Sequence, residues 1–198
     1  WDPVENAAFM PWLTSTAFLH SVMIQEKKDM LKVWNMVLVI LTFALTIFGT
    51  FLTRSGVISS VHSFTQSGMG PFFMGFLLFV LAVSIGLLLW RLPMLKSRNE
   101  LESVFSREAA FLVNNWVLLF SALFVLFATM FPTLSEAVRG ERLTVAAPFF
   151  NQWMLPVGLV LLLLTPLVVL RTPTDIFPAI NIPVISVVWQ YAGLSAQE

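Results

Sequence analysis

Long apolar stretches alternate with short polar ones along most of the chain. Four stretches have about the 20 residues that an α-helix needs to cross a hydrocarbon layer about 30 Å thick. A shorter stretch near the start contains hydroxyl side chains and a histidine, so we expect its polar side to face the interior of a helix bundle. The predicted spans are residues 9–24, 33–52, 72–90, 111–131 and 153–170.

Composition favours the same class of protein. Hydrophobic residues make up 58% of the sequence and charged residues 11%, and the mean hydropathy is +0.85, which is more apolar surface than a soluble core of this size can bury. The sequence therefore predicts an all-α polytopic membrane protein in contact with lipid, with about five transmembrane helices, short loops and a short extended C-terminal tail. The net charge of zero gives no basic field, so nucleic acid is not an expected partner.

The basic residues predict an orientation, because lysine and arginine in short loops accumulate on the cytoplasmic side of a membrane. They concentrate in the loops after the first and third predicted spans. These are Lys27, Lys28, Lys32, Arg91, Lys96, Arg98 and Arg107. We therefore expect residues 1–11, 53–71 and 132–152 to lie outside. The chain begins at Trp1 without a basic leader, so we also expect residue 1 to be an internal position of a longer protein.

Histidine supplies the only nitrogen or sulfur ligands of the usual metal-binding kind, because the chain has no cysteine and two histidines. His20 lies within the first predicted span, where an imidazole needs a partner. Thr16 lies one turn earlier and is a candidate neighbour. Two interpretations stay open for His20, an interhelical hydrogen bond and a metal or haem ligand.

His62 lies in a predicted outside loop, where a histidine is usually solvated. Apolar residues at Val57, Val61 and Phe64 recur at nearly helical spacing around it. This spacing predicts a short amphipathic helix on the membrane surface that would hold His62 at the interface. Solvation and ligation both remain open for this residue.

Haem would suit such a protein, since it is a flat, mostly apolar ring that takes imidazole on its iron and carries two carboxylates. Arg54, at the end of the second span, is a candidate partner for a propionate because a guanidinium pairs well with a carboxylate. The alternative for Arg54 is a simple anchor at the membrane interface.

Three motifs, in order, carry a family resemblance. Residues 1–13, Trp-Asp-Pro-Val-Glu-Asn-Ala-Ala-Phe-Met-Pro-Trp-Leu, resemble the end of the tryptophan-rich WWD signature of haem-handling membrane proteins. Residues 17–21 resemble the family's transmembrane histidine motif, and residues 53–57 with 60–64 resemble its external haem-ligand loop. Within that family the sequence is similar to the CcmF-type cytochrome c haem lyases over about residues 1–160. Shorter similarities fall at residues 106–109, 114–115, 131–134 and 148–151.

The resemblance implies that His20 is an axial ligand of a buried b-type haem and that His62 is an axial ligand of a second, external haem. Each haem would take its other ligand from outside this sequence. It further implies a set of residues along the edge of the external haem. These are Trp1, Asp2, Pro3, Glu5, Asn6 and Trp12.

The implied function is cytochrome c biogenesis at a bacterial inner membrane. The chain would be the core of a haem lyase complex that joins haem to the Cys-x-x-Cys-His motif of apocytochrome c by thioether bonds. Residues 1–11, the His62 loop and residues 132–152 would then be periplasmic. The implied partners are a haem chaperone, apocytochrome c and other cytochrome c maturation subunits. The absence of cysteine fits, because the substrate would supply the thiols.

The tail departs from this family. Residues 171–195 resemble the N-terminal region of an RND multidrug efflux pump, in which the β-branched residues 184–188 would form a strand. We therefore divide the chain into a haem-handling domain, residues 1–165, and a foreign tail, residues 166–198, joined as a chimera between about residues 161 and 171. A coincidental proline-rich tail is the alternative.

Two other classes of function were weighed against the lyase. A transporter, either a haem exporter or a piece of an efflux pump, needs charged residues along a path through the membrane, and none interrupts the four clear spans. A non-catalytic assembly subunit would use small residues such as Ala82 and Gly86 only to pack helices.

Overall fold

The computed structural model describes residues 1–57, 68–97 and 107–171, with side chains for residues 1–57, 68–97 and 109–163. These residues form five α-helices and one short 3-10 turn, and the described part of the chain contains no strand. The elements are α1 (Pro3–Lys28), α2 (Lys32–Ser55), α3 (Gly70–Arg91), η1 (Leu92–Leu95), α4 (Arg107–Arg139) and α5 (Ala147–Arg171). Each predicted span falls within one helix, so the all-α membrane fold is confirmed.

Length and apolar composition allow four of these helices to cross a membrane: Pro3–Lys28, Lys32–Ser55, Gly70–Leu95, which includes η1, and Ala109–Arg139. The described apolar part of α5, Ala147–Leu163, is shorter. The expected extended tail, residues 172–198, and the expected strand within it lie outside the described residues.

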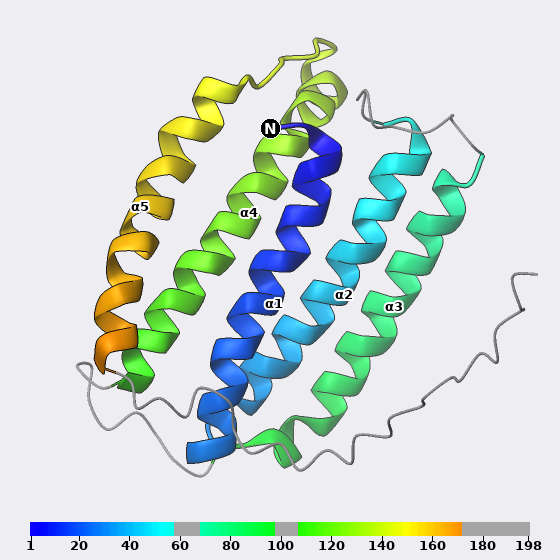
Figure 1. Ribbon diagram of the computed structural model, residues 1–198. Helices are drawn as coiled ribbons and strands as arrows, with labels where there is room; N and C mark the ends of the chain where they lie inside the picture. Colours follow the sequence, from blue (N-terminus) through cyan, green and yellow to red (C-terminus); the bar gives the residue numbers. More distant parts are fainter. Residues whose placement is uncertain (58–67, 98–106, 172–198) are drawn as a thin grey trace, which may run out of the picture.

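The helices run antiparallel in a row, with α1 in the centre (Figure 1). α2 and α4 pack on the two sides of α1, α3 packs on α2, and α5 packs on α4. Consecutive helices therefore alternate in direction. The start of α1, the end of α2, the start of α3 and the α4–α5 connection share one end of the bundle, here called the Trp1 end (Figure 1). The α1–α2 corner and η1 share the other end.

Helix α1 has well-defined ends. The Asp2 carboxylate accepts a hydrogen bond from the Val4 amide at 2.8 Å, and Pro3 occupies the first turn, where its missing N–H is not needed. At the other end Asp29 is left-handed, with φ 53°, and its amide donates to the Gln25 carbonyl. Lys32 pairs with the Asp29 carboxylate at 2.6 Å, so a tight corner leads directly into α2.

The polar side of α1 faces its neighbours, as its sequence predicted. Asn6, Thr14 and Ser21 are buried, and hydrogen bonds at several depths join α1 to the adjacent helices. The Asn6 amide donates to the Thr129 hydroxyl of α4 at 3.0 Å, and the Thr42 hydroxyl of α2 donates to that of Thr14 at 2.8 Å. In a membrane each such bond stabilises the helix pair by about 0.6 kcal/mol on average.

The small residue that matters for packing is Gly49, not the pair suggested by the sequence. A Cβ added at Gly49 would lie 3.2 Å from the Ala7 carbonyl oxygen, because α1 and α2 are close together there. Ala82 and Gly86 are exposed, and a Cβ at Gly86 would meet nothing within 4 Å. The alternative in which Ala82 and Gly86 pack helices therefore has no support within the described residues, where both lie on the open face of α3.

We expect Gly49→Leu to lower the free energy of unfolding by about 1–3 kcal/mol, since the larger side chain forces α1 and α2 apart. Gly86→Leu is the matched control, a glycine in the neighbouring helix with open space around it, and should change stability by less than about 0.5 kcal/mol. Unfolding by SDS in mixed micelles measures both. Equal losses would show that the close approach at Gly49 does not limit stability.

Candidate functional site

His20 projects from α1 toward α4. Its Nδ1 lies 2.7 Å from the Asn114 amide nitrogen of α4, and the ring centroids of His20 and Phe111 are 5.9 Å apart. The imidazole is half-buried. Thr16, the neighbour suggested by the sequence, instead donates its hydroxyl hydrogen to the Trp12 carbonyl at 2.8 Å. His20 thus makes an interhelical hydrogen bond, but with Asn114.

This contact still leaves His20 able to hold a metal. The hydrogen bond engages Nδ1, so Nε2 is the nitrogen left for an axial ligand. A single half-buried imidazole suits one side of a haem iron, whose other ligand must then come from elsewhere. Among the side chains that the structure describes, no group of three or more His, Cys, Asp or Glu gathers to hold a metal ion on its own.

The Trp1 side chain is fixed by α5. Its ring stacks on Phe150, with centroids 4.9 Å apart and planes 12° from parallel, and its indole nitrogen donates to the Asn151 side-chain oxygen at 2.6 Å. Phe9 of α1 meets the same indole edge-on at 6.2 Å. An aromatic cluster therefore joins the start of α1 to the start of α5, although about 150 positions separate them.

The other residues expected along a haem edge have different surroundings. Asp2 caps α1, Pro3 opens its first turn and Glu5 is exposed on that turn. Trp12 is 57% exposed and stacks on Phe9 at 5.7 Å. Asn6 is only 3% exposed, and its amide donates a hydrogen bond to Thr129. It therefore faces the α1–α4 contact, whereas Trp12 lies on the exposed surface of α1.

Arg54 lies in the last turn of α2, exposed and at the Trp1 end. Nearby, the Arg142 guanidinium of the α4–α5 connection donates to the Val57 carbonyl at 3.3 Å, which joins two of the connections at this end. His62 and the short helix predicted around it lie outside the described residues.

His20 and the Trp1 cluster lie at different depths in the bundle. Seventeen positions separate Pro3 from His20 on the same helix, which is about 26 Å at 1.5 Å per residue. His20 is closer to the α1–α2 corner than to the Trp1 end. His20 and the start of α1 are therefore separate places on the same helix.

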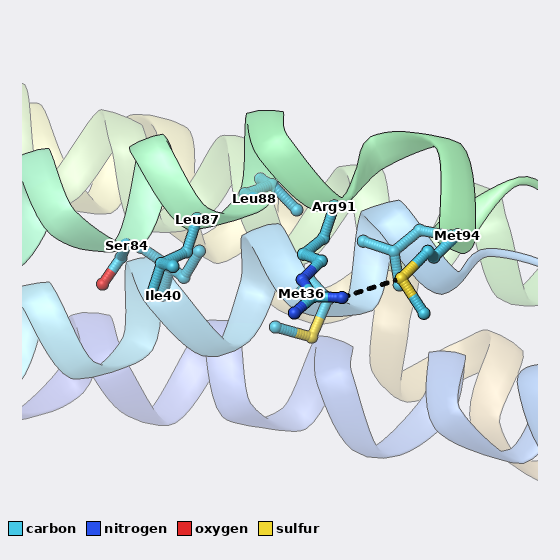
Figure 2. Close-up of a pocket in the computed structure, with 8 residues that line it drawn as sticks. Met36, Ile40, Ser84, Leu87, Leu88, Arg91 and Met94 are labelled. Carbon is cyan, nitrogen blue, oxygen red and sulfur yellow. Dashed lines mark hydrogen bonds between the residues drawn. The ribbon is translucent and has the colours of Figure 1, made fainter.

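A groove of about 470 Å³ lies between α2 and α3 near the α1–α2 corner, away from all these residues (Figure 2). Its walls are apolar, with Met36 and Ile40 on one side and Leu87 and Leu88 on the other. Its charge comes from Arg91, which contacts the Met94 sulfur at 3.1 Å and lies 4.4 Å above the Trp90 ring. None of the candidate haem residues lines this groove.

Comparison with known proteins identifies the family of this chain. A family model described as Cytochrome C assembly protein matches residues 1–59, which include α1 and α2. The cytochrome c-type biogenesis protein CycK of Rhizobium meliloti is 45% identical over 152 residues, 76% of this chain and 22% of that protein. CcmF of Haemophilus influenzae is 40% identical over 191 residues, 93% of this chain and 29% of that protein.

A solved structure is also similar to this chain, in fold as well as in sequence. The cytochrome c haem lyase CcmF superposes on 80% of this chain and 22% of its own, with a TM-score of 0.59 and 36% identity. The chain belongs to the CcmF-type family of cytochrome c biogenesis proteins. It spans about a quarter of the length of these CcmF relatives. The resemblance seen in the sequence motifs is confirmed, and the transporter alternative is not favoured.

Sequence reasoning missed the roles of Asn114 and Asn151. Both fall in short stretches that resemble CcmF proteins, residues 114–115 and 148–151, so a signal was present. That signal said nothing about their partners, because His20 and Trp1 are about 94 and 150 positions away in the chain.

We expect Asp2→Ala to lower the free energy of unfolding by about 0.5–2 kcal/mol, because α1 loses its N-terminal cap. Asp2→Asn keeps a capping oxygen and should retain most of that stability. Denaturation of both variants in the same micelles measures the difference. If Asp2→Asn keeps its stability but loses bound haem, the carboxylate has a role at the haem edge beyond capping.

Proposed function

We propose that this chain is the haem-handling core of a CcmF-type cytochrome c haem lyase, which helps attach haem covalently to the Cys-x-x-Cys-His motif of apocytochrome c. The observation that carries the proposal is the placement on one helix, α1, of a half-buried imidazole and, about 26 Å away, an ordered tryptophan cluster. In addition, this chain is similar in fold and sequence to a solved cytochrome c haem lyase.

In this proposal His20 is one axial ligand of a resident b-type haem. Its Nδ1 is engaged by Asn114 and the ring is half-buried, which suits a ligand held on a rigid helix. When bound, that haem supplies electrons that keep the iron of the second haem ferrous. The remaining ligand lies outside this sequence, since the chain has only one other histidine and we assign that one to the Trp1 end.

The external haem is substrate, and we assign its surroundings to the Trp1 end. His62 is its proposed axial ligand, and Arg54 is the proposed partner of a propionate. The WWD residues would line its edge, with Trp1 and Trp12 giving aromatic surface and Asp2, Pro3, Glu5 and Asn6 shaping the first two turns of α1. Support comes from the fixed position of Trp1, which α5 holds by stacking and by a hydrogen bond.

The reaction needs no nucleophile from this chain. Each thiol of the Cys-x-x-Cys-His motif adds across one haem vinyl group, so a carbon–sulfur bond forms and the thiol hydrogen goes to the neighbouring vinyl carbon. The chain contains no cysteine that would compete for the vinyl groups. Its contribution is to hold haem and peptide in a reactive arrangement, as part of a lyase complex with a haem chaperone and other maturation subunits.

The Trp1 end is proposed to be periplasmic, at the inner membrane of a bacterium. Lys27, Lys28 and Lys32 cluster at the other end of the bundle, with Arg91 at the end of α3 and Lys96 after η1, which supports a cytoplasmic side there. Haem attachment would then take place at the Trp1 end, on the outer face of the membrane.

The division into a haem-handling domain, residues 1–165, and an efflux-pump-like tail, residues 166–198, remains a proposal. The tail lies largely outside the described residues. The alignment with the Haemophilus influenzae CcmF covers 93% of the chain and so enters the tail, which counts against a foreign origin for all of it. Sequencing source DNA across codons 150 to 180 decides the matter, since a continuous CcmF reading frame excludes a chimera.

We expect single cysteines to report the orientation, because the parent chain has none. Glu141→Cys, at the Trp1 end, should react almost completely with an impermeant maleimide in intact spheroplasts. Lys27→Cys, equally exposed at the other end, should react only after the membrane is permeabilised. The reverse pattern would contradict the proposed topology.

We expect R. meliloti CycK whose corresponding stretch is replaced by this sequence, expressed in haem-replete cells and purified in detergent, to show a low-spin b-type absorption spectrum. His20→Ala should abolish this spectrum and His62→Ala should retain it. The full-length exchange protein is used because the second ligand of the b-type haem is proposed to lie outside this sequence. Oxidised and reduced spectra measure the outcome. Absence of haem from the full-length exchange protein would refute the lyase proposal.

A further inference from the structure

We propose that Asn114 is a positioning residue for His20, which holds the imidazole so that Nε2 is free to bind haem iron. The inference rests on the proposed function, in which His20 is the ligand. It assigns a role to a residue of α4, a helix beyond the stretch that matches the family model.

Packing of the two helices places Asn114 opposite His20. Asn6 bonds to Thr129 and His20 bonds to Asn114 across the same antiparallel pair, α1 and α4. The two contacts are 14 positions apart on one helix and 15 on the other, or about 21 Å. Matching spacings mean that the helices cannot slide past each other without breaking both bonds, so the Asn114 amide stays within reach of the ring.

The rotation of α4 about its own axis determines which of two neighbouring asparagines contacts His20. Asn114 and Asn115 are adjacent in the sequence, but about 100° separates them around α4. Asn114 reaches His20, whereas Asn115 is fully buried and neither of its amide atoms has a partner among the residues that the structure describes. Phe111, one turn before Asn114, lies beside the same imidazole. His20 therefore has a hydrogen-bonding partner and an apolar neighbour on one face of α4.

An amide is suited to this task because it can serve both tautomers of the ring. The structure has the Asn114 amide nitrogen 2.7 Å from Nδ1, an orientation that suits the tautomer in which Nδ1 accepts and Nε2 carries the proton. For Nε2 to bind iron, the proton must be on Nδ1 and must be donated to an acceptor. Rotating the Asn114 amide by half a turn brings its oxygen to the same place, and its nitrogen and oxygen are similar in size.

A carboxylate or an apolar side chain at this position would act differently. A carboxylate accepts strongly from Nδ1–H, makes the imidazole a more basic ligand and favours ferric over ferrous iron. An apolar side chain leaves the Nδ1 hydrogen unpaired in a half-buried site, which costs free energy and loosens the ring. These opposite effects separate a positioning role from a merely structural one.

The test uses full-length R. meliloti CycK carrying this sequence, in four variants: Asn114→Leu, Asn114→Asp, His20→Ala and the control Thr42→Val. Thr42→Val removes a different interhelical bond of α1, the one to Thr14, and touches neither His20 nor α4. Haem affinity is followed by haem transfer to excess apomyoglobin, and the potential of the b-type haem by redox titration. Gel filtration and circular dichroism check folding.

Asn114→Leu should weaken haem binding by about 10–100-fold. Asn114→Asp should keep the haem and favour ferric iron by roughly tenfold, which lowers the midpoint potential by about 59 mV. Thr42→Val should leave both unchanged. Unaltered affinity and spectrum in folded Asn114→Leu would overturn the inference. Should that variant misfold, an unaltered potential in Asn114→Asp would overturn it instead. Retention of the parent spectrum in His20→Ala would refute the ligand assignment itself, a separate result.

Discussion

The structure depends on one constraint, that polar side chains on a membrane helix must find partners among other helices. Helix α1 carries Asn6, Thr14, His20 and Gln25 along its length, and Thr14 and His20 lie within the predicted span, where water is not available. Each finds a side chain on a neighbour: Thr129 and Asn114 on α4, and Thr42 and Asn35 on α2. This need places α1 in the centre of the row and leaves the more uniformly apolar α3 at one edge.

The same bonds make α1 a rigid support for chemistry. Hydrogen bonds at several depths and the close contact at Gly49 fix its register against both neighbours. The Trp1 cluster and His20 are then held at a set separation on one element. Sites built on a packed helix are positioned more precisely than sites on loops. That is what a protein needs if it holds one haem in the membrane and handles another at its surface.

Helices α4 and α5, which come late in the chain, supply the contacts of His20 and Trp1. α5 supplies Phe150 and Asn151 to Trp1, and α4 supplies Asn114 to His20. Residues 1–59, which the family model matches, contain His20, Trp1 and Trp12, while residues of the later helices contact His20 and Trp1. The later stretches 114–115 and 148–151, which also resemble CcmF proteins, contain the residues that make these contacts.

The sequence by itself determined the fold class, the number and approximate position of the helices, the inward-facing polar side of α1 and the family. Apolar run length and local spacing settle these, because they depend on neighbours within a few turns. Only the tertiary structure decided the partners of His20 and Trp1 and the choice of Gly49 over Gly86 as the contact glycine. Such choices depend on the rotation and register of one helix against another, which arise from packing over the whole interface and are encoded in no single segment.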